Sequence, residues 1–285
     1  MAVSARSIFP VRFAVNAYPG RADTRARQVA CTLAAASLLA SFSCAGQASP
    51  PRPEAVPAGS FDPPTKQVTV DIAPSPGNHN TRGVLVCYYY PRLLIKEHAQ
   101  DQMTGARLSM VRTEGEPPAC RLSDEPGERE ISGDDFLMGV KDDLVFFDTG
   151  DTFNGALGFG VVDAATGKQR FEDWVRYRKT PAGSSDLVRV FSTATGYVLK
   201  YTSVAQAECD LHRDGNACWE RIRAKLDLKG NAMPVCTGYE HIAEMAKAFG
   251  TDYFESMVAY PVEVTLSPRP IVESVAGPIA CWPAF

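Results

Sequence analysis

The sequence has 285 residues, of which 45% are hydrophobic and 22% are charged, a composition typical of globular proteins. Residues 1–48 hold five of the 29 basic residues and one of the 33 acidic residues, so residues 49–285 carry 24 basic and 32 acidic side chains, a net charge of −8. An acidic chain repels phosphate backbones, so we expect no nucleic-acid partner.

Residues 1–48 have the three parts of a secretory signal peptide. Five arginines and one aspartate lie in residues 1–27, an apolar stretch covers residues 29–40, and mostly small residues lead to Ala48. The apolar stretch is shorter than the ~20 residues of a membrane-spanning helix. The sequence therefore predicts cleavage after Ala48 and a periplasmic or secreted protein, with a membrane anchor or a cytosolic helix as alternatives.

Cys44 raises a further alternative, a lipoprotein that contacts the membrane through an acyl chain on this residue. A Leu-small-small triplet usually precedes an acylated cysteine, and Ser41 and Phe42 fit the first two places of that pattern poorly. Residues 49–65 contain six prolines, which predict an extended linker. We expect a single domain over residues 66–285.

Within this domain, short apolar runs separated by turn residues predict β-structure. A single helix is expected at residues 239–249, where apolar residues recur at helical spacing and Gly250 follows as a C-cap. The predicted fold is therefore mainly β, an antiparallel meander (sandwich, barrel or propeller-like) with one short helix. The expected strands cover residues 68–72, 83–90, 106–111, 120–122, 143–147, 158–163, 168–171, 187–191, 197–201, 219–228 and 258–266.

Six cysteines remain after residue 48, and an even number in an exported chain predicts disulfides. A turn at Asp214-Gly215 would join Cys209 to Cys218 across a hairpin, and the other four then most simply pair in chain order. Zinc is the disfavoured alternative, because the histidines are scattered, so we expect no metal and no cofactor. The six cysteines are Cys87, Cys120, Cys209, Cys218, Cys236 and Cys281.

Residues 148–150 read Asp-Thr-Gly directly after an apolar run, which resembles the active-site turn of aspartic proteases. Those enzymes need two such carboxylates, and this chain has one copy, followed by Asp151. We expect Asp148 to end a strand in a solvent-facing turn. The alternatives are a hydrolase that uses Asp148 and Asp151, and a calcium loop that also includes Asn154.

Residues 143–150 and 159–168 together resemble a pattern in uncharacterised exported bacterial proteins. The second stretch, Phe-Gly-Val-Val-Asp-Ala-Ala-Thr-Gly-Lys, is also similar to a hairpin of β-propeller blades. The resemblance implies β-meanders and no particular activity.

Aromatic side chains provide the remaining functional signal, since they can pack in a core or stack on a ligand. The candidates are Tyr88, Tyr89, Tyr90, Trp174, Tyr177 and Trp219. No nucleophile motif such as G-x-S-x-G occurs. The leading hypothesis is a non-enzymatic envelope protein that binds an unidentified partner or ligand, and the alternative is an exported hydrolase with carboxylates around Asp148.

Overall fold

The computed structural model describes residues 61–73, 82–100, 105–178, 183–230, 232–240, 242–251 and 254–284. All of them belong to one compact unit, Glu54–Phe285. The predicted signal peptide, Cys44 and most of the predicted linker lie outside the described residues. The last residues of that linker already belong to the fold, because Asp62 pairs with Val140 and the Phe61 ring lies 5.1 Å from the Phe146 ring.

Antiparallel strands make up most of the described structure, with two α-helices and one 3₁₀ helix. The strands are β1 (Lys66–Ile72), β2 (Gly83–Tyr90), β3 (Leu93–Gln100), β4 (Ala106–Arg112), β5 (Arg129–Lys141), β6 (Leu144–Phe153), β7 (Ala156–Asp163), β8 (Lys168–Arg176), β9 (Val188–Thr193), β10 (Gly196–Gln206), β11 (Ser256–Leu266), β12 (Ile271–Ser274) and β13 (Ala280–Pro283). The helices are η1 (Gly183–Asp186), α1 (Leu211–Lys225) and α2 (Ile242–Phe249).

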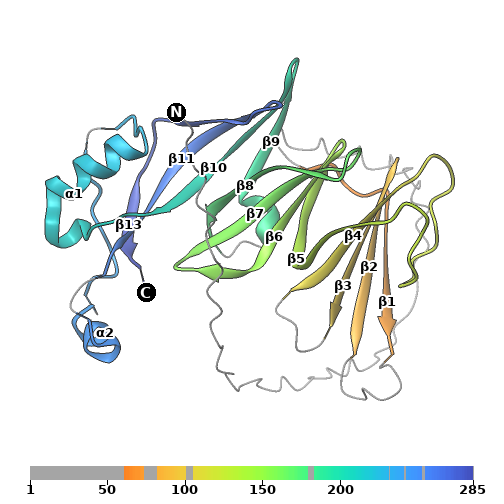
Figure 1. The fold of residues 1–285 in the computed structure, drawn as a ribbon, viewed down its shortest axis with the longest axis horizontal. Coiled ribbons are helices and arrows are strands. Elements are labelled where there is room, and N and C mark those ends of the chain that lie inside the picture. The colour runs from red at the N-terminus through yellow and green to blue at the C-terminus, as the bar shows by residue number, and fades with distance from the viewer. Residues whose placement is uncertain are drawn as a thin grey trace, which may run out of the picture. The chain divides into compact units, whose positions relative to one another are not determined.

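The strands follow one another through the sheet as a meander (Figure 1), which confirms the predicted fold class. Each strand from β1 to β8 pairs with the next, and β10 follows β8 in the sheet. β9 pairs with the first half of β10 as a hairpin, while β12 and β13 pair with different parts of β11. Because the connections are short, each strand pairs with the strand before it in the chain, and this pairing satisfies its backbone hydrogen bonds.

Two hydrophobic cores lie on opposite faces of the central strands. One joins β5–β8 to β9–β11 and contains Phe146, Phe159 and Leu199. The other joins β2–β4 to β5–β7 and contains Phe147. Phe147 lies directly over Gly160 of β7, where a Cβ atom would come within 2.3 Å of its ring, so only glycine fits there without a shift.

The strands expected at residues 158–163 and 168–171, and those expected at 187–191 and 197–201, pair as hairpins. β7 and β8 are joined through Gly167, whose φ of 71° requires the left-handed region that glycine adopts easily. Asp163 Oδ1 accepts hydrogen bonds from the backbone and the hydroxyl of Thr166, which holds the turn. β9, which begins at Val188, pairs with the first half of β10 as expected.

The prediction of a strand at residues 219–228 is wrong, because these residues begin inside α1. Asp210 caps this helix by accepting from the backbone N–H groups of His212 and Arg213 at 2.9 and 3.1 Å. The buried residues of α1 recur at helical spacing; they are Leu211, Cys218, Trp219 and Ile222. The pattern was hidden because Gly215, with φ 55° and ψ −131°, interrupts the helix just before Cys218. The fold therefore has two α-helices instead of one.

The other helix, α2, lies within the predicted residues 239–249, and Gly250 follows it with φ 66°, as expected for a C-cap. Four strands were missed, β3, β5, β12 and β13. β3 continues to Gln100 and β5 covers Arg129–Lys141, where the polar composition predicted loops. Residues 120–122, predicted as a strand, belong to a loop.

The three predicted disulfides are present, Cys87–Cys120, Cys209–Cys218 and Cys236–Cys281. The pairing is as expected, but the Cys209–Cys218 bond clamps the first turns of α1 instead of a hairpin. Disulfides are typical of proteins that fold outside the reducing cytoplasm. In the described part of the chain, neither α-helix has the length and hydropathy to cross a membrane.

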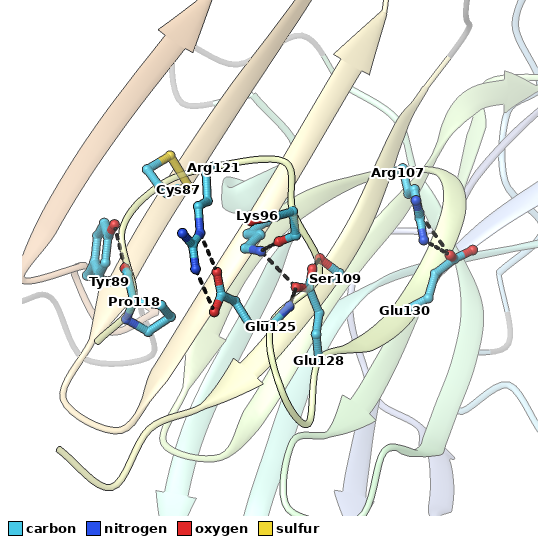
Figure 2. Close-up of polar contacts among 12 residues, drawn as sticks. Cys87, Tyr89, Lys96, Arg107, Ser109, Pro118, Arg121, Glu125, Glu128 and Glu130 are labelled. Atoms are coloured by element: carbon cyan, nitrogen blue, oxygen red, sulfur yellow. Dashed lines mark hydrogen bonds and ion pairs between the residues drawn. A yellow bond between two sulfur atoms is a disulfide. The ribbon is translucent and has the colours of Figure 1, made fainter. Parts of the chain in front are cut away.

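The loop over residues 113–128 covers the outer face of β2–β4 and is fastened by a disulfide and by a buried ion pair (Figure 2). Lys96, only 3% exposed, lies 2.7 Å from Glu128 and donates to the Ser123 carbonyl at 2.9 Å. Ser109 Oγ and the Glu125 N–H donate to the same carboxylate. Burial alone would raise the pKa of Glu128, but these hydrogen bonds and the Lys96 charge hold it below its usual value.

Lys96→Met should lower the free energy of unfolding by about 3–5 kcal/mol, because it leaves a largely buried carboxylate without its cation. The comparison is with Arg107→Met, which breaks the exposed Arg107–Glu130 pair and should cost only about 0–1 kcal/mol. Urea denaturation of both variants measures the difference. Equal losses would show that the buried ion pair does not fasten the loop.

Candidate functional site

Asp148 does not end its strand, contrary to the sequence-based expectation. β6 continues through the Asp-Thr-Gly residues to Phe153, and Asp148 is only 5% exposed. The pairing of β6 with β7 shifts between Asp148 and Thr152, which marks a bulge over the intervening residues. The prediction of a solvent-facing turn at Asp148 is therefore wrong. The Asp151 backbone lies in β6, and its side chain is outside the described structure.

Two other carboxylates lie within electrostatic range of Asp148, on strands the sequence did not connect to it. Glu97 is on β3, and its Oε2 accepts from the Leu137 backbone N–H at 2.9 Å. Burial raises the pKa of Glu97, the Leu137 hydrogen bond opposes this, and the Asp148 charge raises it further. Burial also raises the pKa of Asp135 on β5, against a hydrogen bond from Ser132 and together with the charges on Asp148 and Asp134.

A carboxyl group with a raised pKa is a possible general acid or base, so these three carboxylates form a candidate catalytic site. The meander brings them together because β3, β5 and β6 occupy neighbouring parts of the sheet. Asp148 lines neither the cavity beneath α1 nor the cavity beside Tyr197. Among the described residues, no three histidine, cysteine or acidic side chains are placed to hold a metal ion.

The aromatic candidates separate clearly by exposure. Tyr89, Tyr90 and Trp219 are buried in the cores, and Tyr88 is half-buried. Trp174 and Tyr177, near the end of β8, are 43% and 45% exposed. These two exposed rings leave apolar surface in water, which is typical of interaction sites.

Arg176 and Trp282 complete this surface, which we call the β8 aromatic surface (Trp174, Arg176, Tyr177 and Trp282). Trp174 and Arg176 alternate with the buried Val175, so they lie on the same face of β8. The Arg176 guanidinium lies 5.2 Å from the centre of the Trp282 ring, a cation–π arrangement.

The β6–β7 turn holds two members of this surface in place. Trp282 Nε1 donates to the Asn154 carbonyl at 2.7 Å, and the Tyr177 N–H donates to the Gly155 carbonyl at 3.0 Å. Gly155 lies against the Trp282 ring and has a φ of 77°, a backbone conformation that favours glycine. Hydrogen bonds to the β6–β7 turn therefore fix the positions of Trp282 and Tyr177, as a preformed binding surface requires.

Sequence reasoning included Trp174 and Tyr177 but could not separate them from the core aromatics. It missed Trp282, which lies more than a hundred residues away in the chain. It also missed Glu97 and Asp135, because an isolated acidic residue in a strand has no local signature. The alternation of Trp174, Val175 and Arg176 was the available signal, since it predicts that the tryptophan and the arginine share a face.

Asp148→Asn should lower the pKa of both Glu97 and Asp135, because it removes a negative charge that disfavours their ionisation. NMR titration of the side-chain carboxyl carbons measures both values. The matched control is Asp134→Asn, which should lower the pKa of Asp135 only. If the pKa of Glu97 is the same in Asp148→Asn as in the wild type, the charge of Asp148 does not act on Glu97, and the three carboxylates do not form one site.

Comparisons with protein-family models, with curated proteins and with solved structures gave no match.

Proposed function

We propose that this chain is an exported, non-enzymatic interaction domain that binds a protein partner through the β8 aromatic surface. The observation that carries the proposal is the exposure of Trp174 in β8 and of Tyr177 directly after it, together with Arg176, which lies over the Trp282 ring. Tryptophan, tyrosine and arginine are the residue types most enriched at the energetic centres of protein interfaces.

The export part of the proposal is supported by the arginine-rich and apolar segments in residues 1–48 and by the three disulfides. A periplasmic or secreted location follows if cleavage occurs after Ala48, and acylation of Cys44 would instead attach the domain to a membrane. N-terminal sequencing of the exported protein distinguishes these outcomes.

The proposed interaction is tested with the double variant Trp174→Ala/Tyr177→Ala. Partners captured from envelope extract by the wild type should be lost, and a purified partner should bind at least a hundredfold more weakly, since each hot-spot truncation costs about 2 kcal/mol or more. Leu122→Ala is the matched control, because Leu122 is equally exposed but lies on the distant 113–128 loop. Capture unaffected by the double variant would rule out this surface.

A second function, hydrolysis, is favoured by one observation: strands β3, β5 and β6 hold Glu97, Asp135 and the buried Asp148 close enough for the Asp148 charge to act on the other two. Carboxyl groups held close together in a buried setting are the groups that general acid–base hydrolysis uses. A panel of ester, peptide and glycoside substrates, run on the wild type and on Asp148→Ala, tests this function. Activity that disappears in a folded Asp148→Ala protein would establish the hydrolase and displace the non-enzymatic proposal.

A further inference from the structure

A cavity of about 180 Å³ lies between α1 and the ends of β10 and β11, far along the chain from the β8 aromatic surface. Ala205, Ala207 and Val258 line it from the sheet, and Ile222 and Leu226 line it from the helix. Alanine at two neighbouring positions of the same strand face leaves room that larger side chains would fill. The lining is therefore mainly apolar, and both the sheet and the helix contribute to it.

The cavity cannot close by movement of the helix, because α1 is fastened at its start. The Cys209–Cys218 disulfide ties it to the end of β10, and the Leu211 N–H donates to Ser256 Oγ of β11 at 2.8 Å. Trp219, 1% exposed, is packed into the core beneath the helix. A pocket held open in this way is preorganised for a ligand.

The opening of the cavity is positively charged. Arg221 and Lys225 of α1 both line it and are exposed, and Glu208 is the one acidic residue of the lining. Lys225 lies 2.7 Å from Glu208, so these two charges largely offset each other. Arg221 is the other cation of the lining; its charge also acts on Glu208 and Asp214, and its planar guanidinium suits a carboxylate.

The size of the cavity limits what it can hold. An apolar cavity of about 150 Å³ holds benzene, whereas drug-sized ligands occupy about 300–1,000 Å³. We propose that this cavity binds a small amphipathic carboxylate, with a single ring or short branched chain between Ala207 and Ile222 and the carboxylate paired with Arg221.

The test uses three probes of one shape, 3-phenylpropionate, 3-phenylpropan-1-ol and 3-phenylpropylamine, titrated into the full chain and followed by NMR. Signals of Ala207 and Ile222 should shift most with the acid, less with the alcohol and least with the amine. Absence of shifts at these residues, or binding of the amine as tight as that of the acid, would overturn the proposal.

Arg221→Gln should weaken binding of the acid about tenfold and leave the alcohol unchanged, because it removes one charge-assisted hydrogen bond. The control is Arg213→Gln on the same helix, at a position that does not line the cavity. Equal effects of the two variants would overturn the role of Arg221.

Ala205→Leu tests the cavity itself, because the added side chain occupies the space of the ring and should abolish binding of both acid and alcohol. Ala205 is only half-buried, so the change leaves the core intact, and a dispersed NMR spectrum verifies folding. Binding that persists in a folded Ala205→Leu protein would show that the ligand lies elsewhere. The Arg221 comparison decides the proposal independently if this variant fails to fold.

Discussion

The fold depends on β5, the strand shared by its two halves. Residues from Arg129 to Asp135 pair with β4, and those from Phe136 to Lys141 pair with β6. Register shifts occur in both pairings, and such irregularities bend a strand and change its twist. Because of this bend, β2–β4 can pack onto one face of the sheet, while the other face encloses the core that contains Phe146.

β5 also holds the residues before β1 in place. The Phe61 ring packs over Gly139 of β5, where a Cβ atom would lie within 2.4 Å of the ring.

The elements that could be predicted from the sequence are those with strong local signals. The β7–β8 hairpin follows from the Asp163–Gly167 turn chemistry, and α2 follows from its apolar spacing and Gly250. β5 was missed because its first half pairs with β4 and its second half with β6, in two different environments, so its polar and apolar residues show no single period. α1 was missed because Gly215 interrupts its helical spacing of apolar residues. The apolar residues after Trp219 recur at every second position, which predicts a strand.

In the candidate sites too, local motifs could be found in the sequence, but the residues brought together by the fold could not. Asp148 was singled out for a motif, yet its surroundings are set by β3 and β5, whose carboxylates were not part of any motif. The bulge after Asp148 lets β6 continue where the sequence predicts a turn. The exposure of Trp174 could not be predicted, because it depends on the arrangement of the whole sheet. β2–β4 cover strands β5–β7 and leave the end of β8 uncovered.

The three disulfides join cysteines that are neighbours in chain order, with separations of 33, 9 and 45 residues. None of the three closed loops contains or overlaps another. A chain that enters an oxidising compartment N-terminus first would therefore present both cysteines of each pair before the next pair arrives. Oxidation in that order would give the native connectivity directly, without reshuffling of wrongly paired thiols.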